Sequence, residues 1–209
     1  GIVESRPEIT RVETQRSIYE FTNVGAAPVV VRLKGYKNLA PSGGDVELRA
    51  LGQPLLRYAL VVQGDTVSLD RVPFRMSQQG DPANGGTLSY SASVGAISVA
   101  ISYTFIPDRY LVTIGGRIEG QAQNVYLLTQ LPSTLRPAES DTVGDLNNLA
   151  YSFKPQRENA RIVQFGKLDP GETELEPGPL TWAAVKNKYF VLGLLNPQGS
   201  AFNEVTLKG

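Results

Sequence analysis

The stretch that decides the fold is TWAAVKNKYFVLGLLNP, residues Thr181–Pro197, which holds the only tryptophan of the chain. After Trp182, aromatic and aliphatic residues occupy both alternating sets of positions from 189 to 195. A strand that is apolar on both faces belongs in the middle of a sandwich, and Pro197 ends it because proline offers no backbone donor. The pattern therefore predicts a central core strand, with Phe190 buried.

A second segment shows strict period-two alternation. Ile97–Phe105 places five apolar residues on one face and small or hydroxyl residues on the other. This is typical of a half-buried antiparallel strand and puts Phe105 in the core. Asn84-Gly85 predicts a hairpin, because both residues tolerate positive φ.

Further strands follow along the chain. Asn124–Leu131 reads as a strand that is apolar on both faces, and Leu149–Lys154 with Arg161–Phe165 reads as a hairpin. No amphipathic helical stretch of three turns and no fixed-period repeat occurs. The spacing of short strands predicts an all-β antiparallel sandwich with little helix.

Composition excludes several function classes. The 209 residues are 41% hydrophobic and 19% charged, with twenty basic and twenty acidic side chains, and they include no His and no Cys. A Ser-His-Asp triad, a Cys-His pair and the usual zinc sites are therefore excluded, and the charge balance disfavours a nucleic-acid surface. We expect no enzymatic activity, no cofactor and no metal. No run of eighteen apolar residues is present, and the start at Gly1 without a leader indicates an excised or processed segment.

Four groups of polar or aromatic residues are candidate sites, each with a simpler interpretation. Alternating glutamates could bind a cation or protect a strand edge, and the acidic loop could hold a carboxylate pair or only be solvated. A basic stripe could face a membrane or be the wet face of a sheet, and an aromatic platform could bind a ligand or belong to the core. The groups are, in that order, Glu172, Glu174 and Glu176; Glu139, Ser140, Asp141, Thr142 and Asp145; Arg32, Lys34 and Lys37; and Tyr19, Phe21, Tyr36, Tyr103 and Phe105.

Three glycine pairs are not phosphate loops, because neither Lys-Ser/Thr nor a helix follows them. We expect turns or bulges at Gly43-Gly44, Gly85-Gly86 and Gly115-Gly116.

Two stretches resemble the periplasmic domain of bacterial YidC membrane protein insertases. The first is Trp182 followed by Lys-Asn-Lys-Tyr-Phe and an aliphatic run. The second is SIYEFTNVGAAPVVVRLKGYKNL, residues Ser17–Leu39, which resembles the first hairpin of that domain and carries its Leu-Lys-x-Tyr-Lys ending. Gly25, Ala26 and Ala27 stand where family members usually have an Arg-Gly-Gly turn.

The resemblance implies a fold and a role. The fold would be a β-super-sandwich of galactose mutarotase type on the periplasmic side of the bacterial inner membrane. The domain would perform no chemistry and would assist membrane protein insertion and folding by contacting Sec translocon accessory subunits or nascent clients. Family members usually continue past the equivalent of Gly209, so the resemblance implies a sandwich truncated at its C-terminus.

Two other functions are alternatives. A sugar-modifying enzyme of the mutarotase superfamily would need a histidine acid, which the chain lacks. A carbohydrate- or peptide-binding module would use a concave sheet face.

The expected organisation is a flexible arm over residues 1–15 and a single sandwich domain over 16–209. Exposed strand edges are natural docking places, because they offer unpaired backbone groups. The segment Glu172–Glu176 resembles a protected edge. We therefore expect docking first at the polar excursion Pro132–Asn148 and at the strands that it joins, although no single binding residue is assigned.

Overall fold

The computed structural model describes residues 7–120, 124–197 and 199–209. Contacts divide the chain into two compact units. Unit 1 contains Gly1–Tyr36 and Asp45–Gln130, and unit 2 contains Lys37–Gly44 and Leu131–Gly209. The single domain predicted for residues 16–209 stays a prediction, and each unit is described by itself.

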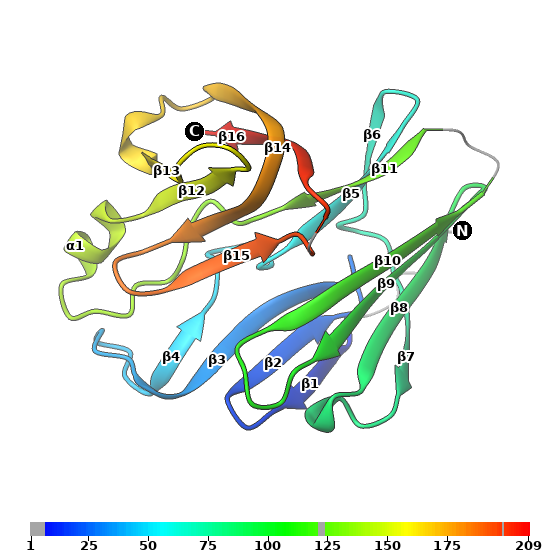
Figure 1. Cartoon of the computed structure of the whole chain (residues 1–209). Coiled ribbons are helices and arrows are strands. Elements are labelled where there is room, and N and C mark those ends of the chain that lie inside the picture. Colours follow the sequence, from blue (N-terminus) through cyan, green and yellow to red (C-terminus); the bar gives the residue numbers. More distant parts are fainter. Residues whose placement is uncertain (1–6, 121–123, 198) are drawn as a thin grey trace. The chain divides into compact units, whose positions relative to one another are not determined.

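Unit 1 contains three antiparallel sheets (Figure 1). The first has the order β1-β2-β3-β4, with the bounds Ile9–Glu13, Ser17–Thr22, Ala27–Lys37 and Asp45–Leu48. The second has the order β10-β9-β8-β7, with the bounds Val112–Glu119, Ile97–Phe105, Thr87–Val94 and Arg75–Gln79. The third has the order β11-β5-β6, with the bounds Val125–Gln130, Arg57–Val62 and Asp65–Ser68.

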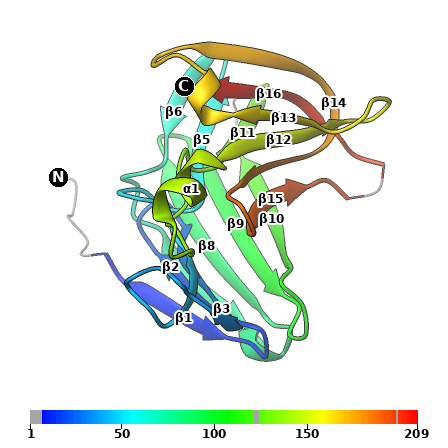
Figure 2. The same cartoon turned by 90° about the vertical axis from the view of Figure 1, so that its left-hand side faces the viewer.

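The first two sheets of unit 1 face each other across an aromatic core. Figure 2 shows β1, β2 and β3 as one layer and β8, β9 and β10 as another. Phe21 of β2 packs on Tyr103 and Phe105 of β9, with ring centroids 4.6 and 5.8 Å apart. Tyr19 reaches Phe105 at 5.1 Å. The alternation predicted for Ile97–Phe105 and the burial of Phe105 are confirmed, because Val99, Ile101, Tyr103 and Phe105 are all buried.

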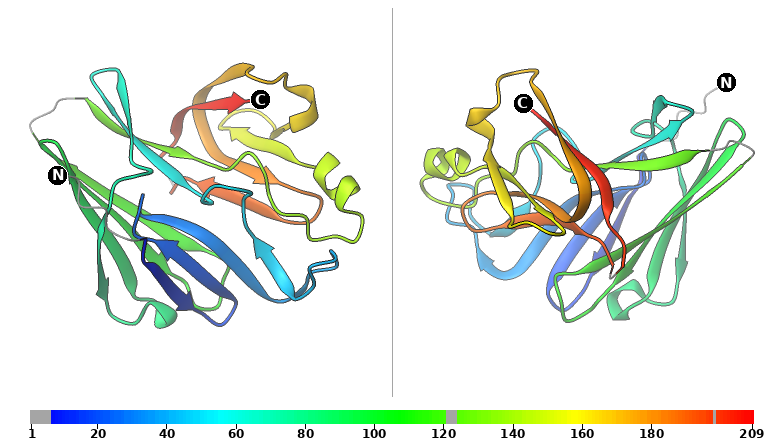
Figure 3. Two further views of the ribbon diagram at one scale, coloured as in Figure 1. Left: turned by 180° about the vertical axis from the view of Figure 1, so that it is seen from behind. Right: turned by 45° about the horizontal axis from the view of Figure 1, so that its top comes forward.

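Unit 2 is built on one antiparallel sheet with the order β13-β12-β14-β15. Its fifth strand, β16, pairs with the first half of β14, whereas β15 pairs with the second half. Figure 3 shows β14 bending between these halves. The bounds of β12 to β16 are Ala150–Pro155, Arg161–Gln164, Thr173–Lys186, Val191–Leu195 and Phe202–Lys208.

One core cluster of unit 2 joins residues of β12, β14 and β16. Phe153, Leu180, Ala183 and Leu207 are buried together, with Leu168 among the partly buried residues packed against them. Among the residues that the structure describes, helix is confined to short pieces: α1 spans Thr142–Asn147, and two 3-10 turns, η1 and η2, span Pro82–Asn84 and Phe165–Lys167. The predicted all-β antiparallel fold with little helix is confirmed.

The predicted central core strand over Thr181–Pro197 is wrong. The segment forms a hairpin instead, in which β14 ends at Lys186 and β15 returns along its edge. Asn187 makes the turn, because its Oδ1 accepts hydrogen bonds from the amides of Tyr189 and Phe190 at 3.2 and 2.8 Å. Phe190 is accordingly half-buried and not a core residue.

Two other segments differ in part from what the sequence predicts. β11 carries apolar residues on both faces, as predicted, but it is not a core strand, because Tyr126 and Leu128 on one face are exposed while Val125 and Leu127 on the other are only partly covered. Residues 9–13 of the expected flexible arm form β1, in which Val12 is buried opposite Tyr19 of β2. Residues 1–6 of that arm lie outside the described residues.

Two of the three glycine pairs lie in turns, and the third lies inside a strand, where it allows close cross-strand packing. Gly43 and Gly44 have φ of 61° and 83° and lie in a turn, and Gly85 has φ of 95° at the end of η1. Gly115 and Gly116 lie inside β10, whose register with β9 is unbroken, so the bulge expected there is not formed. A Cβ at Gly115 would lie 2.7 Å from Ser102 Oγ, which explains the need for glycine by close cross-strand packing.

Candidate functional site

The three alternating glutamates do not converge. Glu172 accepts a hydrogen bond from the Asp169 amide at 2.8 Å, and Glu176 pairs with Arg161 at 3.0 Å. Glu174 lies in the ladder opposite Leu207 of β16. In residues 7–120, 124–197 and 199–209, no three acidic side chains gather in a way that could hold a metal ion.

The acidic loop contains a structural carboxylate. Asp141 caps α1 by accepting from the Gly144 amide at 2.9 Å. Asp145 is buried and accepts from the Ala138 amide at 2.8 Å, from Asn187 Nδ2 at 3.3 Å and from the Lys188 amide at 3.2 Å. The loop therefore holds the turn between β14 and β15, because Asp145 bonds both Asn187 and Lys188.

Arg32 and Lys34 of the basic stripe and all five platform aromatics have structural contacts inside unit 1. Arg32 pairs with Glu47 at 2.6 Å, and Lys34 pairs with Glu13 at 2.8 Å. Lys34 holds the pKa of Glu13 below its usual range by a hydrogen bond and by its charge. Four of the five platform aromatics are buried, and Tyr36, which is exposed, packs on Tyr110 at 6.1 Å. These residues stabilise the fold and leave no row of exposed rings for a ligand.

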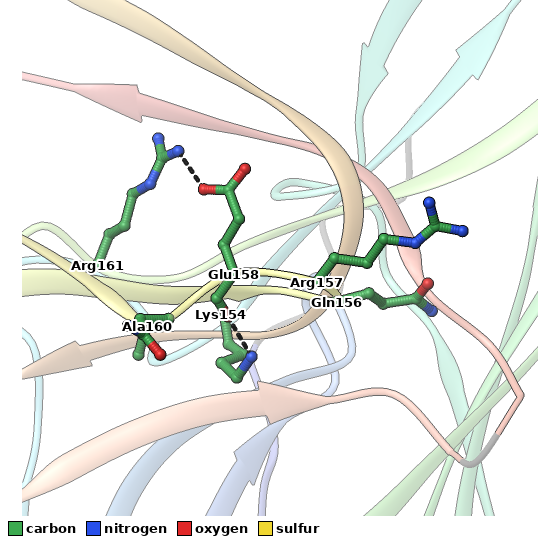
Figure 4. A pocket seen from close by; sticks show the side chains of 7 residues that line it. Lys154, Gln156, Arg157, Glu158, Ala160 and Arg161 are labelled. Carbon is green, nitrogen blue, oxygen red and sulfur yellow. Dashed lines mark hydrogen bonds and ion pairs between the residues drawn. The ribbon is translucent and has the colours of Figure 1, made fainter.

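A cationic depression lies at the turn between β12 and β13 (Figure 4). Lys154 Nζ donates to the backbone oxygens of Pro155 and Glu158, and Arg161 pairs with Glu158 at 2.6 Å. Figure 4 shows Arg157 pointing to the side opposite Arg161. Because the protein itself occupies Lys154 and Arg161, the depression has no convergent set of charges for an anion.

A second depression lies over the outer face of the sheet β10-β9-β8-β7. Arg75, Ser91, Ala100 and Arg117 form one row across the four strands. Arg117 pairs with Glu119 at 2.6 Å, and both side chains are mostly exposed. No aromatic side chain lines this depression, so it offers no stacking surface for a sugar.

One surface that combines exposure with apolar character is the edge of β15, defined as Val191, Gly193 and Leu195. Val191 and Leu195 are 61% and 67% exposed. Among the residues that the structure describes, β15 pairs on one side only, with β14. Unpaired edges with apolar side chains are places where proteins bind one another, which makes this edge the candidate functional site.

Hydrogen bonds connect the start of the candidate site to the rest of unit 2. Asn187 is buried and donates its amide to Phe190 O at 3.0 Å while its side chain bonds Asp145. Lys188 lies beside this turn, and the Tyr189 hydroxyl, followed by Glu139 and Asp141, raises its pKa. The segment Pro132–Asn148 and the β14–β15 hairpin are thus joined by one hydrogen-bond network. The sequence pattern missed this site, although the polar Lys186-Asn187-Lys188 run was a turn signal.

The longest helix in the described part of the chain has six residues, which is far too short to cross a bilayer. A comparison with curated protein sequences finds no match. The family model of the YidC periplasmic domain matches residues 9–209, which includes both stretches whose resemblance the sequence indicated. With an all-β antiparallel fold and a family match over nearly its whole length, the chain belongs to the YidC periplasmic domain family.

Proposed function

We propose that this domain is a non-catalytic, periplasm-facing part of a YidC-type inner membrane insertase, and that it assists insertion and folding through protein contacts. Its partners are Sec translocon accessory subunits or nascent membrane proteins. The observation that carries the proposal is the edge of β15, where exposed apolar side chains stand beside unpaired backbone. The composition supports a role without chemistry, because the chain has neither His nor Cys.

Cross-linking tests this proposal in the intact membrane protein. A photo-reactive residue at position 191 or 195 should trap a translocon subunit or a client chain. The same probe at position 175 is a matched control, because Leu175 is 57% exposed in the same sheet but lies where β14 pairs with β16. We expect trapping from 191 and 195 and little from 175.

The alternative of a carbohydrate-binding module predicts a different result. Probes on β15, on α1 and on the remaining strand edges would then trap no protein, while the detached domain would bind a defined oligosaccharide tightly. The burial of the aromatic platform gives that alternative no support.

A further inference from the structure

Most edge strands in the described part of the chain carry charge. At least one charged residue lies in β1, β4, β6, β7, β10, β13 and β16. The two exceptions are β11, with the sequence VYLLTQ, and β15, with the sequence VLGLL. Charged residues on edges prevent pairing with other strands. β15 therefore lacks this protection, and it is the one of the two that holds no polar side chain.

The register of the hairpin decides which backbone groups of β15 are free. Asn187 donates to Phe190 O, and Asn196 donates to Thr181 O. Hydrogen-bonded and non-hydrogen-bonded pairs alternate along an antiparallel ladder. The intervening bonded pairs are therefore Val185 with Leu192 and Ala183 with Leu194. It follows that the N–H and C=O groups of Val191, Gly193 and Leu195 point away from β14, toward an incoming strand.

The side chains beside these free groups define what such a strand would carry. Residues directly opposite each other lie on one face, so Val191 shares a face with Lys186, and Leu195 shares it with Trp182. Lys186 has no ion-pair partner among the residues that the structure describes. On an incoming strand, an acidic side chain is therefore favoured next to Val191, because it lies near Lys186. An apolar side chain is favoured next to Leu195, because it lies near Trp182.

The middle position is open. Gly193 is exposed and has no side chain, and it lies opposite Ala184, which has a small one. A large ring on a neighbouring strand can cover an edge glycine. The buried Asp145 and Asn187 hold the start of β15 in place, so little ordering of the edge would be needed on binding.

From this arrangement we propose that the edge of β15 binds an extended polypeptide segment as an added antiparallel strand. Along one face the segment carries an apolar residue next to Leu195, an aromatic residue over Gly193 and an acidic residue next to Val191. This inference deepens the proposed function and rests on it, since it states how the partner chain is recognised.

A synthetic peptide tests the mode of binding with the full 209-residue chain. The probe is a blocked peptide of about seven residues, Thr-Val-Thr-Tyr-Thr-Glu-Thr, which is long enough to span β15. Amide hydrogen exchange is measured by NMR with and without the peptide. We expect the amides at 191, 193 and 195 to slow by about tenfold or more, because they gain hydrogen bonds. The amides at 192 and 194 already bond β14 and should not change.

Two variants sharpen the test. Leu195→Pro removes an outward N–H without breaking the ladder to β14, since proline is tolerated on an edge in this orientation, and it should abolish the protection. Lys186→Glu should weaken binding of the glutamate peptide. The same variant should bind more tightly a peptide in which lysine replaces that glutamate. Leu128→Lys, on the other uncharged edge, is the control and should leave binding unchanged.

Several outcomes would overturn the inference. Side-chain shifts at 191 and 195 without amide protection would show apolar docking and not strand addition. If the lysine peptide binds Lys186→Glu no better than the glutamate peptide does, the antiparallel placement is wrong. Protection at β11 alone would move the site to that strand. If cross-linking from β15 still traps a translocon subunit while the peptide tests fail, the proposed function stands and only this mode of recognition is wrong.

Discussion

Buried tyrosine hydroxyls connect two sheets of unit 1 at the scale of single residues. Tyr58 of β5 and Tyr103 of β9 share a hydrogen bond of 2.7 Å, and Tyr103 donates to Ala26 O at 2.7 Å. Burial is the first cause that raises the pKa of Tyr58, to about 12, and it also raises the pKa of Tyr103. The aromatic residues that could have formed a ligand platform are therefore a source of stability.

These hydroxyls make the domain sensitive to alkali. The unfolded state releases the Tyr58 proton near pH 10, whereas the folded state keeps it until about pH 12. The folded state thus binds more protons in this window, so the free energy of unfolding falls as pH rises from 10 to 12. The loss from this group is about 2–3 kcal/mol. Urea unfolding at pH 9 and at pH 11 measures this effect. Between these two pH values, the free energy of unfolding should fall less in Tyr58→Phe than in the unchanged chain.

The exposed Tyr126 is the control for this measurement. Tyr126→Phe should leave the loss between pH 9 and pH 11 as it is in the unchanged chain. An equal loss in all three proteins would show that Tyr58 is not responsible.

Two phenylalanines that the sequence pattern treated alike should differ in their effect on stability. Phe105 is fully buried between the sheets of unit 1, so Phe105→Ala should cost about 3–5 kcal/mol. Phe190 is half-buried in a turn, so Phe190→Ala should cost about 1–2 kcal/mol. Equilibrium urea unfolding measures both losses, and equal losses would contradict the placement of Phe190.

At the scale of elements, one buried carboxylate ties a loop to a hairpin. Asp145 accepts three hydrogen bonds from groups on the loop and on the turn after β14. Buried donors that lose their acceptor are costly, so the support of β15 depends on this side chain. The position of β15 consequently depends on the hydrogen bonds of Asp145 and not on the residues of β15 alone.

Removing that carboxylate should loosen the hairpin. Asp145→Ala leaves three donors without their acceptor and should cost about 3 kcal/mol or more. Asp141→Ala, in the same segment, removes only an exposed cap and should cost about 1 kcal/mol. Urea unfolding gives the two values, and hydrogen exchange at 192 and 194 shows whether β15 has frayed. Similar costs for both variants would contradict the supporting role of Asp145.

At the scale of the whole molecule, the sequence predicts one cooperative domain, and the contacts divide the chain into two units. Trp182 is the only tryptophan and lies in unit 2, whereas strands of both units contribute to far-UV circular dichroism. If the chain unfolds as one domain, the two probes should give the same urea midpoint and slope. Separate midpoints would show that unit 2 unfolds independently.

The fold class and several strands could be predicted, because their signals are local. Period-two alternation placed Ile97–Phe105 correctly, and Asn84-Gly85 lies in the connection between β7 and β8. The candidate site could not be found in this way. An apolar run indicates burial, yet Val191 and Leu195 of β15 are exposed, and β15 is an edge strand in the described part of the sheet.

The sequence by itself determined that the chain is all-β, that it lacks the usual catalytic and zinc-binding residues, and that it resembles the YidC periplasmic domain, since these follow from composition, alternation and short motifs. Only the tertiary structure decided which apolar residues are buried and which polar residues are structural. Phe190 lies in a turn, Asp145 is buried under a hairpin, and Val191 and Leu195 form an open edge. The reason is physical: burial and hydrogen bonding depend on neighbours that are distant in sequence, such as Asp145 and Asn187.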